Sequence, residues 1–166
     1  MLFYKHWSAC QAAYKSIEQG KQHQKSTIFN KPNIMNNLSF DHVHYRSSNL
    51  DVSRKFYLDV MEATELPSLE LGDNLNLQFA LGGVTLLFVL STKKPMPTPV
   101  PAGNRLGVYH IAFLVDDCDI ATKYYVGRGA EVAIDPFDAS DTIRASFLTA
   151  PDGMLVELKQ IIPSTS

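Results

Sequence analysis

The sequence predicts an α+β fold in which two β-α-β-β-β modules form one cup-shaped, mixed-sheet domain. The first observation is an internal repeat: residues 40–57 align without a gap with residues 108–125, which places His42 on His110. The second is a change of period within each copy, from the alternation of a strand to the spacing of a helix. The third is a Gly-bearing turn between two β-rich runs after each helix, which is typical of a hairpin. Because the segments are duplicated, both copies are expected to share one architecture.

Module one is expected at residues 38–90. It begins with a short alternating strand, passes the polar turn SSN and continues as a helix that Asn49 caps. A second strand is expected near residues 65–71. A hairpin follows, with one strand at 75–80 and another in the run VTLLFVL after Gly83. Four strands alone would make a marginal core, so this module is expected to share a domain with the next.

Module two is expected at residues 106–162 in the same order. Its polar turn is DDC, with Asp117 as the helix cap, and its second strand is expected near residues 130–134. Its hairpin joins residues 143–149 to the run MLVELKQI through the turn PDG. The linker at 91–105 carries four prolines, which cannot join a central strand and indicate an extended connection.

Residues 1–36 differ in composition from the rest of the chain. Residues 1–34 hold five lysines and a single acid, Glu18, whereas the remaining residues hold 10 basic and 16 acidic side chains. A secretory signal is not indicated, because Lys5 and His6 interrupt the apolar run. We interpret this part as a partly helical or disordered extension, or as sequence ahead of an internal start at Met35.

Composition excludes several classes of protein. The 166 residues are 45% hydrophobic and 19% charged, with a net charge of −2, so nucleic acid is not an expected partner. No apolar run approaches the roughly 20 residues of a membrane-spanning helix. We therefore expect no membrane partner, and we expect a cytoplasmic location. A chain of this length needs no disulfide framework, so Cys10 and Cys118 are not expected to be paired.

Two imidazoles and one carboxylate form the candidate site. His42, His44 and Arg46 share one face of the first strand, because strand side chains alternate. If the modules pack as symmetric copies, His42 and His110 occupy equivalent places, and Glu157 in the last strand comes near them. Such donors suit a divalent first-row metal. The alternatives are a packed or surface histidine, a solvent-facing glutamate, and His44 as a competing ligand.

These segments resemble the vicinal oxygen chelate superfamily, which groups glyoxalase I, extradiol dioxygenases, methylmalonyl-CoA epimerase, fosfomycin-resistance enzymes and bleomycin-binding proteins. The resemblance covers about residues 38–161. It is carried by FDHVHYRSSNLDVSRKFY, by GVYHIAFLVDD and by APDGMLVEL. These motifs together are specific for the superfamily and much less specific for one reaction.

The resemblance implies one divalent metal ion, Fe, Mn, Ni or Zn, held by His42, His110 and Glu157. The family's fourth ligand position falls on Leu87, which cannot bind a metal, and this argues against isomerisation by a metal-bound carboxylate. The remaining set is similar to extradiol dioxygenases and fosfomycin thiol transferases. Extradiol dioxygenases usually carry a tyrosine where this chain has Phe147. Fosfomycin thiol transferases carry several basic residues after the glutamate, whereas this chain has only Lys159 after Glu157.

Four more residues are candidates for the site. His44 is a possible acid or base near neutral pH, or simply bonds a neighbouring strand. Arg46 falls where glyoxalase I contacts its substrate, or reaches solvent. Tyr109 and Arg144 are candidate substrate contacts at the edge of the site. Cys118 lies among acids, where a thiolate is disfavoured, so it is not expected to be a nucleophile.

The sequence thus predicts a metalloenzyme, expected to be a homodimer, that acts on a small oxygen-bearing metabolite. The ligand count favours dioxygenase-type chemistry. The small size favours a glyoxalase-like lyase or isomerase, or a thiol transferase. A third alternative is a metal-free protein that binds a drug or metabolite, as bleomycin-resistance proteins do.

Overall fold

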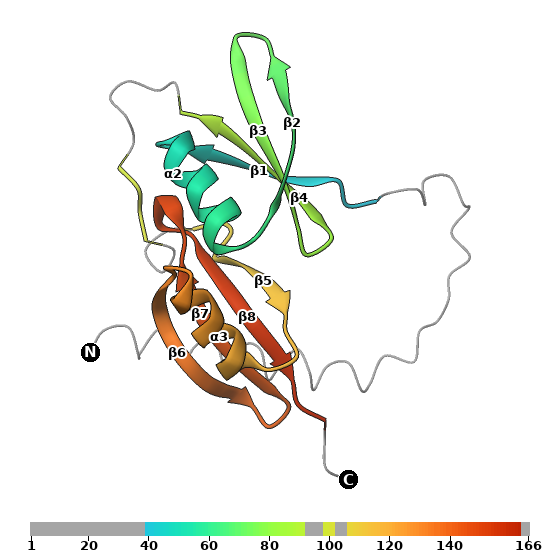
Figure 1. The fold of residues 1–166 in the computed structure, drawn as a ribbon, viewed down its shortest axis with the longest axis vertical. Helices are drawn as coiled ribbons and strands as arrows, with labels where there is room; N and C mark the ends of the chain where they lie inside the picture. The colour runs from blue at the N-terminus through green and yellow to red at the C-terminus, as the bar shows by residue number, and fades with distance from the viewer. Residues whose placement is uncertain (1–38, 92–97, 102–105, 164–166) are drawn as a thin grey trace. The chain divides into compact units, whose positions relative to one another are not determined.

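The computed structural model describes residues 39–91, 98–101 and 106–163 (Figure 1). The predicted extension at 1–36 lies outside the described residues, as does most of the predicted linker. Both modules belong to one compact unit, Phe40–Ser166. Among the described residues, no helix is long and apolar enough to cross a membrane.

Module one follows the predicted order and forms a four-stranded sheet. The strand order is β1-β4-β3-β2, with β1 parallel to β4 and the other pairs antiparallel. A helix ending in a π-helical turn follows β1 and lies against β4. The elements are β1 (His42–Ser47), α2 (Leu50–Lys55), η1 (Phe56–Val60), β2 (Thr64–Leu71), β3 (Asn74–Leu81) and β4 (Val84–Leu90).

Module two repeats this arrangement. Its strand order is β5-β8-β7-β6, and β5 is parallel to β8. The longer helix α3 lies across β6, β7 and β8 (Figure 1). The elements are β5 (His110–Leu114), α3 (Cys118–Gly127), β6 (Glu131–Ser140), β7 (Ile143–Thr149), η3 (Pro151–Gly153) and β8 (Leu155–Ile161). The predicted module architecture is confirmed, although β6 extends well beyond the predicted residue 134.

The two predicted helix caps are confirmed. The Asn49 side chain accepts hydrogen bonds from the backbone N–H groups of Asp51 and Val52, at 3.0 and 3.2 Å. The Asp117 side chain accepts one from the N–H of Ile120, at 2.8 Å. Each cap satisfies first-turn donors that have no partner within the helix, and a cap of this kind contributes about 1 kcal/mol.

One hydrophobic core joins the two modules. Helix-facing side chains of both sheets belong to a single cluster, in which Tyr57, Phe79 and Phe88 pack ring against ring. The most deeply buried aliphatic members are Leu86, Leu148, Val156 and Leu158. Each fully buried side chain of this size contributes about 1.5–3 kcal/mol. The shared core explains why neither four-stranded sheet has to be stable alone.

Polar contacts also link the modules within this unit. The Ser48 backbone N–H and hydroxyl both donate to the Asp152 carboxylate in the β7–β8 turn. The Arg128 guanidinium donates to the carbonyl oxygens of Asp59 and Val60 at the end of η1. The Tyr124 hydroxyl donates to Glu62, at 2.7 Å.

The sheets stay separate at the strands that carry the predicted ligands. β1 and β5 each have one hydrogen-bonded neighbour and form the edges of their sheets. No ladder joins β1 to β5 in the part of the chain that the structure describes. The first strand of each module therefore presents a free edge.

Candidate metal centre

Two of the three predicted ligands lie together on adjacent strands. In the parallel β5–β8 pair, His110 lies opposite Leu155 and Ala112 opposite Glu157, so both functional side chains share one face. The His110 Nε2 atom is 2.9 Å from Glu157 Oε2. The Glu157 side chain is only 13% exposed and that of His110 is 31% exposed. A carboxylate so far removed from water requires a polar partner.

The His110 ring is held by aromatic neighbours. Its centroid lies 5.3 Å from that of Phe147 and 5.3 Å from that of Tyr109, and both contacts are edge-to-face. Its Nδ1 atom is buried and has no hydrogen-bond partner within the described part of the chain. A buried imidazole nitrogen without a partner carries a desolvation cost. This cost falls on Nδ1, whereas the nitrogen that faces the Glu157 carboxylate is Nε2.

His42 lies at the start of β1 and has a different partner. Its Nδ1 atom is 2.5 Å from the Asp41 carboxylate, which leaves Nε2 as the available nitrogen. The His44 ring centroid lies 6.0 Å away along the same face of β1. A carboxylate on one imidazole nitrogen fixes the tautomer and makes the other a better metal ligand. Asp41 is not among the residues predicted from the sequence. Its position directly before His42 is a signal from which a carboxylate partner for the imidazole could have been predicted.

The structure does not bring all three predicted ligands together within the chain. Among the described residues, no group of three or more His, Cys, Asp or Glu side chains is placed to hold a metal ion. His42 pairs with Asp41, and His110 pairs with Glu157. The physical reason is that β1 and β5 belong to separate sheets.

The His110–Glu157 pair fits the chemistry of a divalent metal. Ligand atoms bound at about 2.1 Å and at right angles to each other are about 3 Å apart, which is close to the observed 2.9 Å. An imidazole nitrogen with a carboxylate oxygen suits Zn, Fe, Mn or Ni. The chemistry of the pair therefore fits two of the ligands of a metal site, and no third donor is placed beside it among the described residues.

Leu87 occupies the place in module one that Glu157 occupies in module two. In the register, His44 lies opposite Leu87 just as Ala112 lies opposite Glu157. Leu87 is 4% exposed and has no donor atom to offer. At this pair of positions, module one thus carries its titratable side chain on β1, as His44, whereas module two carries it on β8, as Glu157.

Arg144 is not placed beside the metal donors. In the β7–β8 register, Phe147 lies opposite Glu157 and Arg144 opposite Gln160, so Arg144 points to the helix-covered face. Its guanidinium donates to Asp119 on α3, at 2.5 and 2.9 Å, and to Asp138 at 2.8 Å. These bonds raise the pKa of Arg144 and lower that of Asp119. The side chain is occupied by two carboxylates.

The remaining sequence candidates are placed as follows. Tyr109 touches the His110 ring and therefore lies beside the His110–Glu157 pair, which we call the half-site. Arg46 lies four residues along β1 from His42, a distance of about 13 Å in a strand. Cys118 is fully buried and donates to the Leu158 carbonyl oxygen, at 3.5 Å. Burial raises the pKa of its thiol, so Cys118 is not an activated nucleophile.

Comparison with known proteins identifies one relative by sequence and others by structure. The chain is 28% identical over 123 residues to the protein YaeR of Escherichia coli (strain K12), covering 70% of this chain and 92% of YaeR. It resembles the structure of TnmS3, an antibiotic binding protein from Streptomyces sp. CB03234. There the identity is 22%, the TM-score is 0.57, and 76% of this chain and 98% of that chain are covered.

A third relative was solved with a metal ion. The chain resembles a mutant of the fosfomycin resistance protein FosX from Listeria monocytogenes, complexed with Mn(II) and 1S,2S-dihydroxypropylphosphonic acid. The identity is 18%, the TM-score is 0.52, and 72% of this chain and 87% of that chain are covered. A family model matches residues 39–158, which include every predicted ligand. The chain therefore belongs to the Glyoxalase/Bleomycin resistance protein/Dioxygenase superfamily.

Proposed function

We propose that the protein is a divalent-metal-dependent enzyme that acts on a small oxygen-bearing molecule. The metal would be held by His110 and Glu157 from one half-site and by His42 from another. The observation that carries the proposal is the 2.9 Å approach of His110 Nε2 to Glu157 Oε2, with the Glu157 side chain only 13% exposed.

We infer that the two half-sites meet between two copies of the chain. β1, which carries His42, and β5, which carries His110, both present a free sheet edge. Exposed apolar side chains flank β5, with Val108 57% and Leu114 74% exposed. An unpaired, partly apolar edge is a surface that proteins ordinarily cover. A two-fold dimer that set β1 of one copy against β5 of the other would form two equivalent three-ligand sites.

The metal would supply Lewis-acid polarisation of a bound substrate oxygen. His44, on the same face as His42, is proposed to hold or transfer a proton of the bound substrate. Tyr109 is proposed as a substrate contact because it touches His110. Leu87 has no donor atom to add as a fourth protein ligand, so coordination positions would be left for the substrate.

The donor set favours one reaction class over the others. Two imidazoles and one carboxylate with open positions are typical of iron(II) enzymes that use oxygen, which favours dioxygenase-type chemistry. A glyoxalase-like lyase or isomerase normally needs a carboxylate where this chain has Leu87. A thiol transferase remains the alternative that the likeness to FosX, solved with Mn(II), supports.

A metal-free binding protein is the second candidate, because the matched structure TnmS3 is named an antibiotic binding protein. Metal analysis separates the two. Protein purified without chelator and reloaded with Fe, Mn, Ni or Zn is expected to hold about one equivalent per chain. Less than about one-tenth of an equivalent would refute the enzyme proposal. Glu157→Gln should weaken metal binding at least about tenfold, whereas Glu131→Gln, an exposed change in the same sheet, should not.

Mixing two inactive variants tests the shared site. His42→Ala and Glu157→Ala homodimers should each lack an intact site. After denaturation and refolding as an equal mixture, half of the dimers are mixed, and each has one intact site. Metal content should then recover to about one quarter of the wild-type value. If the mixture binds no more metal than the separate variants, the ligands do not come from two copies.

A further inference from the structure

The face of module two that carries His110 and Glu157, which we call the ligand face, also carries Lys159. The register fixes this placement, because Ala112 lies opposite Glu157 in the parallel β5–β8 pair and Leu114 lies opposite Lys159. Side chains two residues apart on one strand share a face, with backbone positions about 7 Å apart. The Lys159 side chain is partly buried. The ligand face therefore holds a cation within the length of a small molecule from the half-site.

Lys159 is the only lysine or arginine on the ligand face of β5, β7 and β8, three strands that the structure describes in full. Its neighbour on β7 is Ala145, and its neighbour on β5 is Leu114, which is 74% exposed. Ala112, beside Glu157, is exposed as well. The surface that leads from the half-site to Lys159 along β5 is therefore apolar and open to a ligand.

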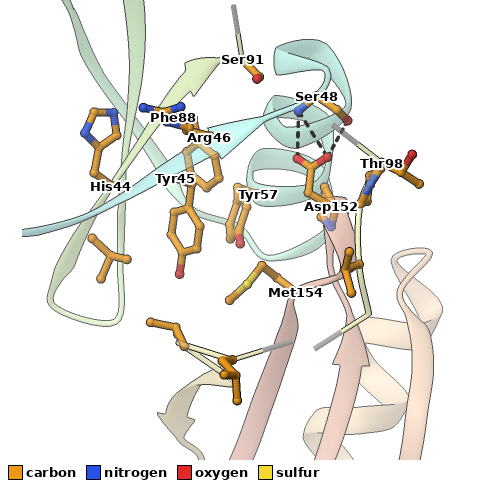
Figure 2. Close-up of a pocket in the computed structure, with 16 residues that line it drawn as sticks. His44, Tyr45, Arg46, Ser48, Tyr57, Phe88, Ser91, Thr98, Asp152 and Met154 are labelled. Carbon is orange, nitrogen blue, oxygen red and sulfur yellow. Dashed lines mark hydrogen bonds between the residues drawn. The ribbon is translucent and has the colours of Figure 1, made fainter. Parts of the chain in front are cut away.

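Module one has a cation at the equivalent pair of positions. Arg46 lies opposite Val89 in the β1–β4 register. Lys159 lies opposite Leu114, and Leu114 is the residue that the internal repeat aligns with Arg46. Figure 2 shows the side chains of Arg46 and His44 on the same side of β1. In each module the cation thus lies two residues beyond the titratable side chain of the preceding pair, on the face that carries the proposed metal ligands.

The charges of the proposed site favour an anionic ligand. The carboxylates of Asp41, which contacts His42, and of Glu157 balance the charge of a divalent metal. Arg46 and Lys159 then make the site positive overall. A site that is positive and walled by apolar side chains attracts anions more strongly than an exposed charge in water does. The arrangement therefore favours a substrate with a negative charge of its own.

We propose that the substrate of the metal centre carries a carboxylate that Lys159 binds. This inference rests on the proposed function and names its substrate class. Oxygen atoms at one end of the substrate would bind the metal, and an apolar body would lie over Ala112 and Leu114. The carboxylate at the other end would accept hydrogen bonds from the Lys159 ammonium, about 7 Å further along β8. One ammonium among apolar neighbours matches a singly charged carboxylate better than a phosphate, which is usually held by several donors.

Two chelating probes test the proposal by calorimetry on the full-length protein loaded with Zn. Adipic acid monohydroxamate and its terminal amide bind a metal through the same hydroxamate oxygens, have the same chain length and differ in the charge of the far end. We expect the acid to bind about tenfold more tightly than the amide. Lys159→Met should remove this preference and Lys159→Arg should retain it. Lys123→Met, which removes an exposed cation on α3, is the matched control and should preserve the preference.

The Zn content of each variant separates this inference from the proposed function. Lys159→Met should hold as much Zn as the wild type, because Lys159 is not a proposed metal ligand. If the wild type holds about one equivalent of Zn and binds the acid and the amide equally, the inference is overturned and the metal function stands. A Lys159→Met variant that keeps the tenfold preference overturns it in the same way. If the wild type holds less than about one-tenth of an equivalent, the proposed function is overturned, and this inference with it.

Discussion

Asp152 links the residue after β1, Ser48, to the β7–β8 turn. Its replacement should show how much this contact contributes to the free energy of unfolding. Its carboxylate accepts hydrogen bonds from the Ser48 backbone N–H, at 3.2 Å to each oxygen, and from the Ser48 hydroxyl at 2.5 Å. Its φ is +59°, a left-handed conformation that Asp and Asn tolerate better than Ala. Substitution of Asp152 by Ala, Gly and Asn separates the contribution of the hydrogen bonds from that of the backbone strain.

The expected losses of unfolding free energy follow from the two contributions. Hydrogen bonds to a charged acceptor contribute about 1.5–3 kcal/mol, and a partly buried contact belongs at the lower end, at about 2 kcal/mol. Left-handed backbone strain in Ala adds about 1 kcal/mol. Asp152→Ala should therefore cost about 3 kcal/mol and Asp152→Gly about 2, because Gly relieves the strain. Asp152→Asn should cost about 1 kcal/mol, because the amide oxygen still accepts.

Urea unfolding followed by far-ultraviolet circular dichroism measures these differences. Asp141→Ala, in the exposed β6–β7 turn, is the matched control and should change stability by less than about 0.5 kcal/mol. The loss of unfolding free energy should increase in the order Asp152→Asn, Asp152→Gly, Asp152→Ala, and this order is the diagnostic result. If Asp152→Ala matches the control, the carboxylate does not hold the two modules together and this reasoning is wrong.

Three further outcomes are expected. Asp41→Ala should weaken metal binding about tenfold, measured by calorimetry, because it removes the carboxylate that orients a ligand imidazole. Arg144→Met should lower the melting temperature at pH 7. Because Arg144 lowers the pKa of Asp119, that difference should persist above the unfolded pKa of about 3.9 and shrink as pH falls through the lower folded pKa. In a Cys10→Ser variant, which leaves Cys118 as the sole cysteine, Ellman's reagent at pH 8 should label the chain in urea and not when folded, because burial raises the pKa of the Cys118 thiol and blocks access to it.

Most of the architecture could be predicted because the sequence contains the same module twice. Strand alternation, the caps Asn49 and Asp117 and the two Gly-bearing turns are local signals, and each is confirmed in the structure. The length of β6 could not be predicted in this way. It continues through Pro136 with several register shifts against β7, and a proline there normally argues for the end of a strand.

The candidate site could be predicted only in part because alternation gives the face of a side chain and not its distance from another sheet. His110 and Glu157 meet because β5 and β8 pair directly. The symmetry of the modules and the family resemblance both predict His42 beside them, whereas no local pattern predicts the separation of β1 from β5. Arg144 depended on register: Phe147, not Arg144, shares the face of Glu157.

The two modules differ at one pair of neighbouring positions, and this difference bears on the reaction. Module two has Ala112 beside Glu157, whereas module one has His44 beside Leu87. Each copy keeps one titratable side chain in this pair, but on a different strand. An ionised carboxylate only accepts hydrogen bonds, whereas a neutral imidazole has one nitrogen that donates and one that accepts. Under the proposed function, Leu87 with His44 beside it therefore favours reactions in which a proton is donated to a substrate oxygen over reactions that need a carboxylate base from module one.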